Sequence, residues 1–323
     1  MLLGAVLIVV DDPLEDDANL RPHFTPGGGK NNALAVFVQD IQAHPVEGYD
    51  KLPKEVKEKR PGTEAIMRAF VNKEAEALKA FDKLMASNSS EWRWPDIEQN
   101  LKITADHSYI SKSLMLATVK DMEVRALTHE GKHQEAVRQS LRVARCGSAM
   151  LHSEGELIHW LIAAKIWRSG EAALESALSG TGVTPELLRD AQEGLTGLEL
   201  RTSDLGFAYR AEVVGFRHTI LNLQSLGISP SQIGLRNWES VLLKPHRTIN
   251  AYQNALKPTI RALDQVNWAM IRESSTKLRA LVFEWDEPAK GFQLSANTYG
   301  TKLLSVSLGM SEPSATKALA TTA

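Results

Sequence analysis

The segment from His129 to His133 reads His-Glu-Gly-Lys-His and matches the H-E-x-x-H pattern of zinc proteases. In that pattern, two histidines on one face of a continuous helix bind zinc, and the glutamate activates the metal-bound water. Gly131 lies between the two histidines, and glycine weakens a helix interior by about 1 kcal/mol relative to alanine. The segment therefore favours a turn between two helices, in which the two imidazole rings diverge.

Two E-x-x-H pairs, Glu130 with His133 and Glu156 with His159, could also contribute to a di-iron site. Such sites combine two of these pairs with further inward glutamates from other helices. The first pair crosses the predicted turn, and the spacing of the remaining glutamates selects no further ligands. We therefore expect no cofactor, no metal and no catalytic residue. The alternative is a metal-binding protein or metal-dependent hydrolase that uses His129, Glu130, His133, Glu156 and His159.

Two other features that could carry chemistry do not complete a known pattern. Cys146 is the only cysteine and lies inside a predicted helix, and no serine lies in a nucleophile-elbow pattern. Residues 25–30 read Thr-Pro-Gly-Gly-Gly-Lys, but Phe24 and Asn31 stand where a phosphate-binding P-loop needs glycine and serine or threonine. The sequence thus supports neither nucleophilic catalysis nor a nucleotide-binding loop.

Helical periodicity dominates the chain, with apolar residues spaced by three and four over most of its length. Thr184-Pro185-Glu186 gives the clearest helix start, because threonine caps, proline suits the first helical position and glutamate meets the positive helix end. We expect an all-α fold of antiparallel helical hairpins, either a tetratricopeptide-like α-solenoid or an irregular bundle. The predicted helices cover residues 32–44, 63–85, 106–131, 132–151, 154–168, from 184 onward, 205–223, from 245 onward, a segment toward 265 that Pro258 either starts or kinks, and 266–285.

The composition is that of an ordinary globular protein, with 43% hydrophobic and 24% charged residues in 323. The net charge is −2, and lysine and arginine are spread evenly, which argues against a nucleic-acid partner. We divide the chain into an N-terminal apolar run and loop (1–30), a helical body (31–285) and an irregular C-terminal segment (286–323).

Residues 2–10 form an apolar run that is too short for a bilayer, which takes about 20 residues. The run is interpreted either as a buried strand or short core segment, or as the remnant of a membrane anchor. The chain also ends at Ala323 inside a segment that reads as the start of a helix. These ends predict a truncated chain from the cell envelope, with a cytoplasmic protein as the alternative.

Four segments in order, GKHQEAVRQSLRVAR, LIHWLIAAKIW, TPELLRDAQEGL and RAEVVGFRH, resemble a group of uncharacterised bacterial helical-hairpin proteins with an N-terminal membrane anchor. The first segment also resembles a single tetratricopeptide-type unit, without that repeat's large aromatic residues. The fourth matches an Arg-small-Glu motif at Arg210, Ala211 and Glu212, where we expect Glu212 to be buried and bound by a neighbouring arginine. The resemblance implies a helical fold without a known activity. We therefore expect a non-enzymatic scaffold or interaction module with a protein partner, and membrane association through the anchor.

Overall fold

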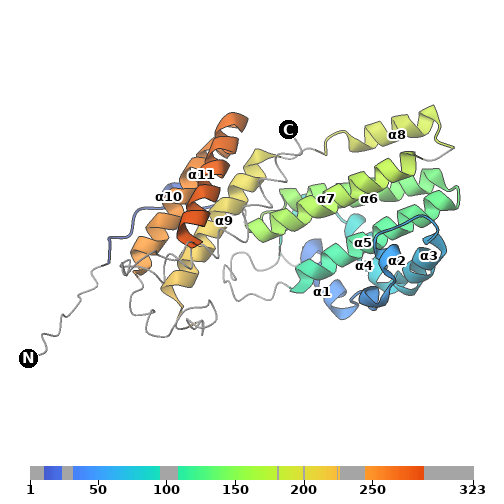
Figure 1. Cartoon of the computed structure of the whole chain (residues 1–323), viewed down its shortest axis with the longest axis horizontal. Helices are drawn as coiled ribbons and strands as arrows, with labels where there is room; N and C mark the ends of the chain where they lie inside the picture. Colours follow the sequence, from blue (N-terminus) through green and yellow to red (C-terminus); the bar gives the residue numbers. More distant parts are fainter. Residues whose placement is uncertain are drawn as a thin grey trace, which may run out of the picture. The chain divides into compact units, whose positions relative to one another are not determined.

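The computed structural model describes residues 11–23, 32–94, 108–179, 182–198, 201–223, 225 and 244–286, and every regular element in these ranges is a helix. The predicted all-α fold is therefore confirmed (Figure 1). The chain divides into two compact units, which are described separately. One contains residues 24–97 and 106–204, and the other contains residues 1–23, 98–105 and 205–323.

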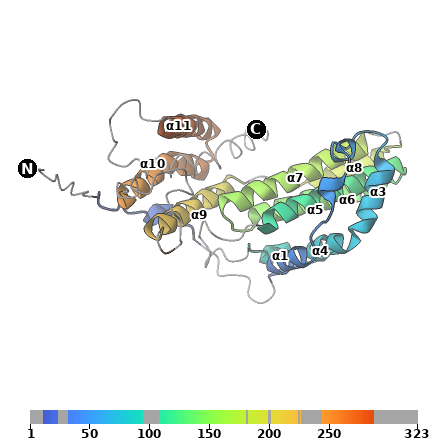
Figure 2. The same cartoon turned by 60° about the horizontal axis from the view of Figure 1, so that its bottom comes forward.

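The first unit is built around three long helices that pack against one another, α5 (Ser108–His129), α6 (His133–His152) and α7 (Leu157–Leu178). Figure 2 shows α1 and α4 running beside α5. Helix α3 packs on α5, and α8 packs on α6. The remaining helices of this unit are α1 (Ala33–Ala43), α2 (Lys54–Lys57), α3 (Glu64–Lys73), α4 (Ala75–Met85), α8 (Pro185–Leu195) and the 3-10 turns Tyr49–Lys51 and Ser89–Glu91.

The predicted turn at Gly131 and the predicted start at Thr184 are both confirmed. Helix α5 ends at His129 and α6 begins at His133, with Gly131 between them at φ 72°, a conformation that glycine adopts at little cost. The Thr184 hydroxyl accepts a hydrogen bond from the Leu187 N–H at 3.3 Å. These two local signals specify the hairpin and the α8 boundary.

Two predicted helices have wrong boundaries. The predicted helix 63–85 is two helices separated at Glu74, whose buried carboxylate accepts a hydrogen bond from the Glu47 N–H at 3.2 Å. The predicted helix 154–168 continues as α7 to Leu178, because Gly170 faces the backbone of α6 and does not end the helix.

The second unit contains α9 (Thr202–Leu221, from Leu205 onward), α10 (Pro245–Asp264) and α11 (Trp268–Asp286), together with residues 11–23 and their 3-10 turn Ala18–Leu20. Helix α10 packs against α11. Pro245 starts α10 as predicted. Of the two alternatives for Pro258, the structure excludes a new helix start, because Pro258 lies inside α10. We call residues 11–23 the N-terminal strap, because they are hydrogen-bonded along α10.

The predicted apolar run 2–10 and residues 287–323 lie outside the described residues. Within the ranges that the structure describes, no helix is both long and apolar enough to cross a membrane.

Candidate functional site

The HEGKH segment lies at the tip of the α5–α6 hairpin. His129 closes α5 and His133 opens α6, so the two histidines belong to different helices. The Glu130 carboxylate accepts hydrogen bonds from Lys132 Nζ at 2.7 Å and Arg68 Nε at 2.6 Å. The Lys132 and Arg68 contacts lower the pKa of Glu130. The carboxylate that a zinc protease would use as its base is thus held between two cations.

The second E-x-x-H pair forms the N-terminal cap of α7. Glu156 is the N-cap residue and its side chain accepts from the backbone N–H of His159. In return, the Glu156 N–H donates to His159 Nδ1 at 3.1 Å. This reciprocal arrangement is a capping box, which satisfies two N–H groups that a helix start leaves without intrahelical acceptors. The Glu156–His159 spacing, which also fits a pair of metal ligands, forms a helix cap here.

His159 is also a core residue, 2% exposed, and its ring has a defined tautomer. Because Nδ1 accepts from a backbone N–H, the proton of the neutral ring is on Nε2. That nitrogen lies 2.5 Å from Tyr109 Oη and donates to it. Trp94 packs on the same ring, with centroids 4.6 Å apart, and Trp94 Nε1 donates to the Met150 carbonyl at 3.3 Å. The cluster joins α5, α6 and the start of α7.

Replacing His159 with phenylalanine should destabilise the first unit. The substitution removes the acceptor of the Glu156 N–H and the donor to Tyr109, and the loss of buried hydrogen bonding costs about 1–3 kcal/mol for each group. His129→Phe at the exposed hairpin tip is the matched control and should change stability by about 0.5 kcal/mol or less. Chemical denaturation of both variants makes the comparison. Equal losses would contradict the capping role of His159.

The five candidate metal ligands therefore form two separate groups, each with its own structural role. His129, Glu130 and His133 surround the hairpin turn, whereas Glu156 and His159 cap α7. Among the residues that the structure describes, no three histidine, cysteine, aspartate or glutamate side chains are grouped to hold a metal ion.

Cys146 is fully buried, and burial raises the pKa of its thiol, which disfavours the nucleophilic thiolate.

The Arg210-Ala211-Glu212 motif lies on α9 in the second unit. Arg210 pairs with Asp264 at 2.6 Å, so it links α9 to the end of α10 as an ion pair between helices. Glu212 is half-buried, and the prediction that it would be buried is wrong. Tyr252 is fully buried on α10, and burial, followed by the charge of Glu212, raises its pKa.

The N-terminal strap supplies the helix cap that α10 lacks in its own sequence. The N-cap residue Lys244 makes no side-chain cap. Instead, the Asp11 carboxylate accepts from the His246 N–H at 2.8 Å and the Arg247 N–H at 3.1 Å. An anionic group at this position also meets the positive end of the helix dipole. Asn250 adds two bonds, accepting from the Glu15 N–H at 3.0 Å and donating to the Pro13 carbonyl at 2.8 Å.

A second buried carboxylate ties the strap to α9. Asp17 is 2% exposed and pairs with Arg217 of α9 and with Arg21 of the strap. Burial raises the pKa of Asp17, but the hydrogen bonds and charges of Arg217 and Arg21 outweigh it and leave the pKa below its ordinary value. The strap is thereby bound to both helices by charged groups.

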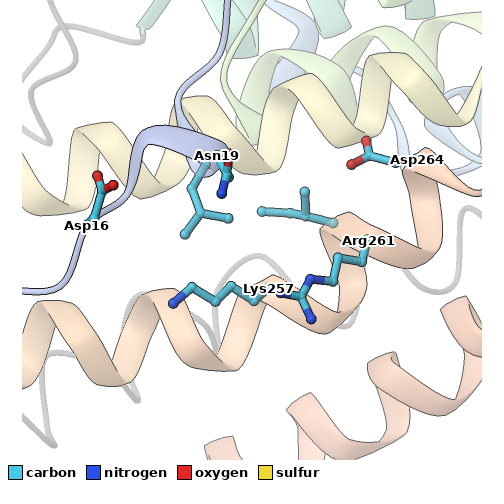
Figure 3. A pocket seen from close by; sticks show the side chains of 7 residues that line it. Asp16, Asn19, Lys257, Arg261 and Asp264 are labelled. Carbon is cyan, nitrogen blue, oxygen red and sulfur yellow. The ribbon is translucent and has the colours of Figure 1, made fainter.

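A cavity of about 310 Å³ lies between the strap and α10 (Figure 3). Its buried apolar wall is formed by Leu20 and Ile260. Figure 3 shows Asp16 at one side of the cavity and Asp264 at the other, while Lys257 and Arg261 follow one another along α10. The cavity therefore combines an apolar wall with charges of both signs, and its polar lining is completed by Asn19.

Sequence reasoning did not find this site. The acidic residues 11–17 follow the apolar run, and their composition alone does not indicate a binding site. Their partners on α10 lie more than 230 residues further along the chain, beyond the reach of any local pattern. The i, i+4 spacing of Lys257 and Arg261 is an available signal, but it is also typical of a solvated helix face.

Comparisons of the chain with models of protein families, with curated proteins and with solved structures found no match.

Proposed function

We propose that the chain is a non-enzymatic helical scaffold that binds a protein partner through the turn between α10 and α11. The α10–α11 hairpin itself would present this surface, while the hairpins of the first unit, which we interpret as partly tetratricopeptide-like, would form a helical body of their own. The observation that carries the proposal is a group of exposed apolar side chains at that turn, Val266, Trp268 and Met270, which we call the apolar apex. Their exposed fractions are 58%, 39% and 40%.

The backbone of the apex is unfavourable for the residue that occupies it. Val266 has φ 51°, in the left-handed region that glycine or asparagine usually occupies after a helix. A left-handed conformation costs about 1–2 kcal/mol for a residue with a β-carbon. An exposed valine gains little burial to offset this cost, and strain of this kind is concentrated at functional sites. The strained valine thus supports a role for the apex in binding.

The chemistry of the apex favours a protein partner with an apolar groove. Tryptophan and methionine are enriched at protein interfaces, and a tryptophan is often a residue that dominates binding energy. Helices that lie on membranes are rich in lysine and arginine on their polar face. Residues 264–271 contain neither, and their only charged residue is Asp264. A membrane surface and a second copy of the chain are the competing occupants.

Trp268→Ser should weaken binding of the partner and leave folding intact. The full chain is used to capture proteins from its source cells, and any protein captured is purified and its affinity for the chain is then measured. We expect at least about a tenfold loss of affinity, because an interface tryptophan commonly contributes 2 kcal/mol or more. Leu188→Ser on α8 is the matched control, since Leu188 is 50% exposed and lies in the other unit.

Val266→Gly separates binding from stability. Glycine relieves the left-handed strain and should raise the thermal midpoint of the second unit, while it removes an apolar contact from the apex.

Three results would contradict the proposal: equal affinity of wild type and Trp268→Ser, concentration-dependent self-association that is lost in Trp268→Ser, or binding to lipid vesicles that depends on Trp268.

A further inference from the structure

The cavity between the strap and α10 contains two charged side chains without an ion-pair partner among the described residues. Among the residues that the structure describes, Asp16 accepts a hydrogen bond only from the Ala18 N–H, at 3.0 Å, within its own turn. Arg261 makes no side-chain hydrogen bond or ion pair with any described residue, although its guanidinium group offers five donors. These two side chains carry opposite charges that remain available to a ligand.

The other charges of the cavity are already neutralised. Lys257 pairs with Glu15 at 3.1 Å and also donates to Asn254 at 2.9 Å. Asp264 pairs with Arg210 at 2.6 Å. The net charge of the remaining pair, Asp16 with Arg261, is zero. A strongly anionic ligand such as a free phosphate would meet the uncompensated carboxylate of Asp16, and a simple cation would meet Arg261.

The apolar wall and the size of the cavity restrict the ligand further. Leu20 is 4% exposed and Ile260 is 1% exposed, and together they form an apolar surface between the charged groups. A cavity of about 310 Å³ is at the lower end of the range for small-molecule sites. The space suits a ligand of about the size of a dipeptide, with an apolar side chain and one charge of each sign.

Gln253 is not part of the cavity lining, but it shows that the same face of α10 has a further side chain without a hydrogen-bond partner among the described residues. It lies one turn before Lys257 on the same helical face, because residues four apart on a helix are neighbours. Its side chain is fully buried, and neither the amide oxygen nor the amide nitrogen has a hydrogen-bond partner among the described residues. Buried amide groups in folded proteins are usually paired with protein or with water.

We propose that this cavity binds a short zwitterionic peptide, with its carboxylate on Arg261, its ammonium on Asp16 and an apolar side chain against Leu20 and Ile260. Arginine suits the carboxylate because its planar guanidinium can donate two parallel hydrogen bonds. The ligand would bridge the strap and α10, and so hold the strap in place. The site is separate from the apolar apex, and either proposal can fail alone.

The probe is the dipeptide Leu-Gly, measured by calorimetric titration of the full chain. Two blocked forms, N-acetyl-Leu-Gly and Leu-Gly amide, each lack one of the two charges. We expect Leu-Gly to bind and each blocked form to bind about tenfold more weakly or worse, as expected for loss of a charged hydrogen-bonded contact. Binding should also slow amide hydrogen exchange in the strap.

Arg261→Met and Asp16→Asn test the two ends of the ligand separately. Arg261→Met should remove the preference for the free carboxylate, and Asp16→Asn should remove the preference for the free ammonium. Arg272→Met and Asp12→Asn are the matched controls, because both side chains are exposed and lie outside the cavity lining. No binding of Leu-Gly at millimolar concentration, or equal binding of the blocked forms, would overturn the proposal.

Discussion

Gly147→Ala and Gly170→Ala should each destabilise the first unit severely, although alanine is the better helix former. A β-carbon on Gly147 would lie 2.2 Å from the Trp167 backbone nitrogen and 2.5 Å from its Cα. A β-carbon on Gly170 would lie 2.3 Å from the Ala144 backbone nitrogen. Because the obstructing atoms belong to the main chain, no side-chain rotation relieves either clash. Helices α6 and α7 would have to separate.

The two contacts belong to one close crossing of antiparallel helices. Gly170 of α7 faces Ala144 of α6. Three residues further along α6, Gly147 faces Trp167, which lies three residues before Gly170 on α7. We expect each substitution to cost about 3 kcal/mol or more, at or above the top of the usual range for overpacking. Separating these helices also loosens the core, because α5 packs against both of them.

Gly206→Ala is the matched control for these substitutions. Gly206 is also inside a helix, but its added β-carbon would meet only the end of Arg210 at 3.3 Å and two further side-chain atoms beyond 3.5 Å. Alanine should therefore be neutral or stabilise α9 by up to about 1 kcal/mol, the difference in helix propensity. The measurement is thermal unfolding together with amide hydrogen exchange in α6 and α7. Similar behaviour of all three variants would contradict the close backbone crossing.

Sequence reasoning succeeded where the signal is local. The hairpin turn at Gly131 and the start of α8 at Thr184 each depend on residues within a few positions of one another. Gly170 shows the limit of that reasoning, since a glycine inside a helical pattern reads as a break. Only the residue across the helix interface, Ala144, explains why glycine is needed there. That pairing is tertiary and has no counterpart in local spacing.

The same limit applies to the candidate sites. An E-x-x-H pair has the same spacing whether it binds metal or caps a helix, and only the position of Glu156 at the start of α7 decides between them. The cavity combines residues 16–20 with residues 257–264, and hydropathy patterns do not reveal which distant segments meet. The charged strap residues could be noticed in the sequence, but their partners could not be assigned.

Asp17→Ala should release the N-terminal strap from α9 and make the second unit less stable. The substitution leaves Arg217 and Arg21 without the carboxylate that they share. Removing one partner of a buried ion pair costs about 3–5 kcal/mol. We expect a loss of about 3 kcal/mol, the low end of that range, because the Arg217 side chain is 26% exposed and can be rehydrated. Faster amide exchange in residues 11–23 and 244–264 is the direct measurement.

The contribution of Asp17 to the stability of the folded chain should also be lost at acidic pH, because the pKa of Asp17 is lowered in the folded state. Because the folded pKa is below the unfolded value, the ion pairs stabilise the folded chain fully above the unfolded pKa, about 3.9 for aspartate. Their contribution is then lost as the pH falls from there through the folded pKa. The difference in stability between wild type and Asp17→Ala should therefore be largest near neutral pH and shrink below about pH 4.

Comparing the two proteins at each pH removes the effects of the other carboxylates, which titrate equally in both. Asp12→Ala is the control, since the Asp12 side chain is exposed and, within the described ranges, only its backbone groups are hydrogen-bonded. Because the chain has two units, exchange rates in the strap and α10 are more informative than one global unfolding midpoint. A difference between wild type and Asp17→Ala that stays constant from pH 7 to about pH 3 would show that the Asp17 charge does not hold the strap.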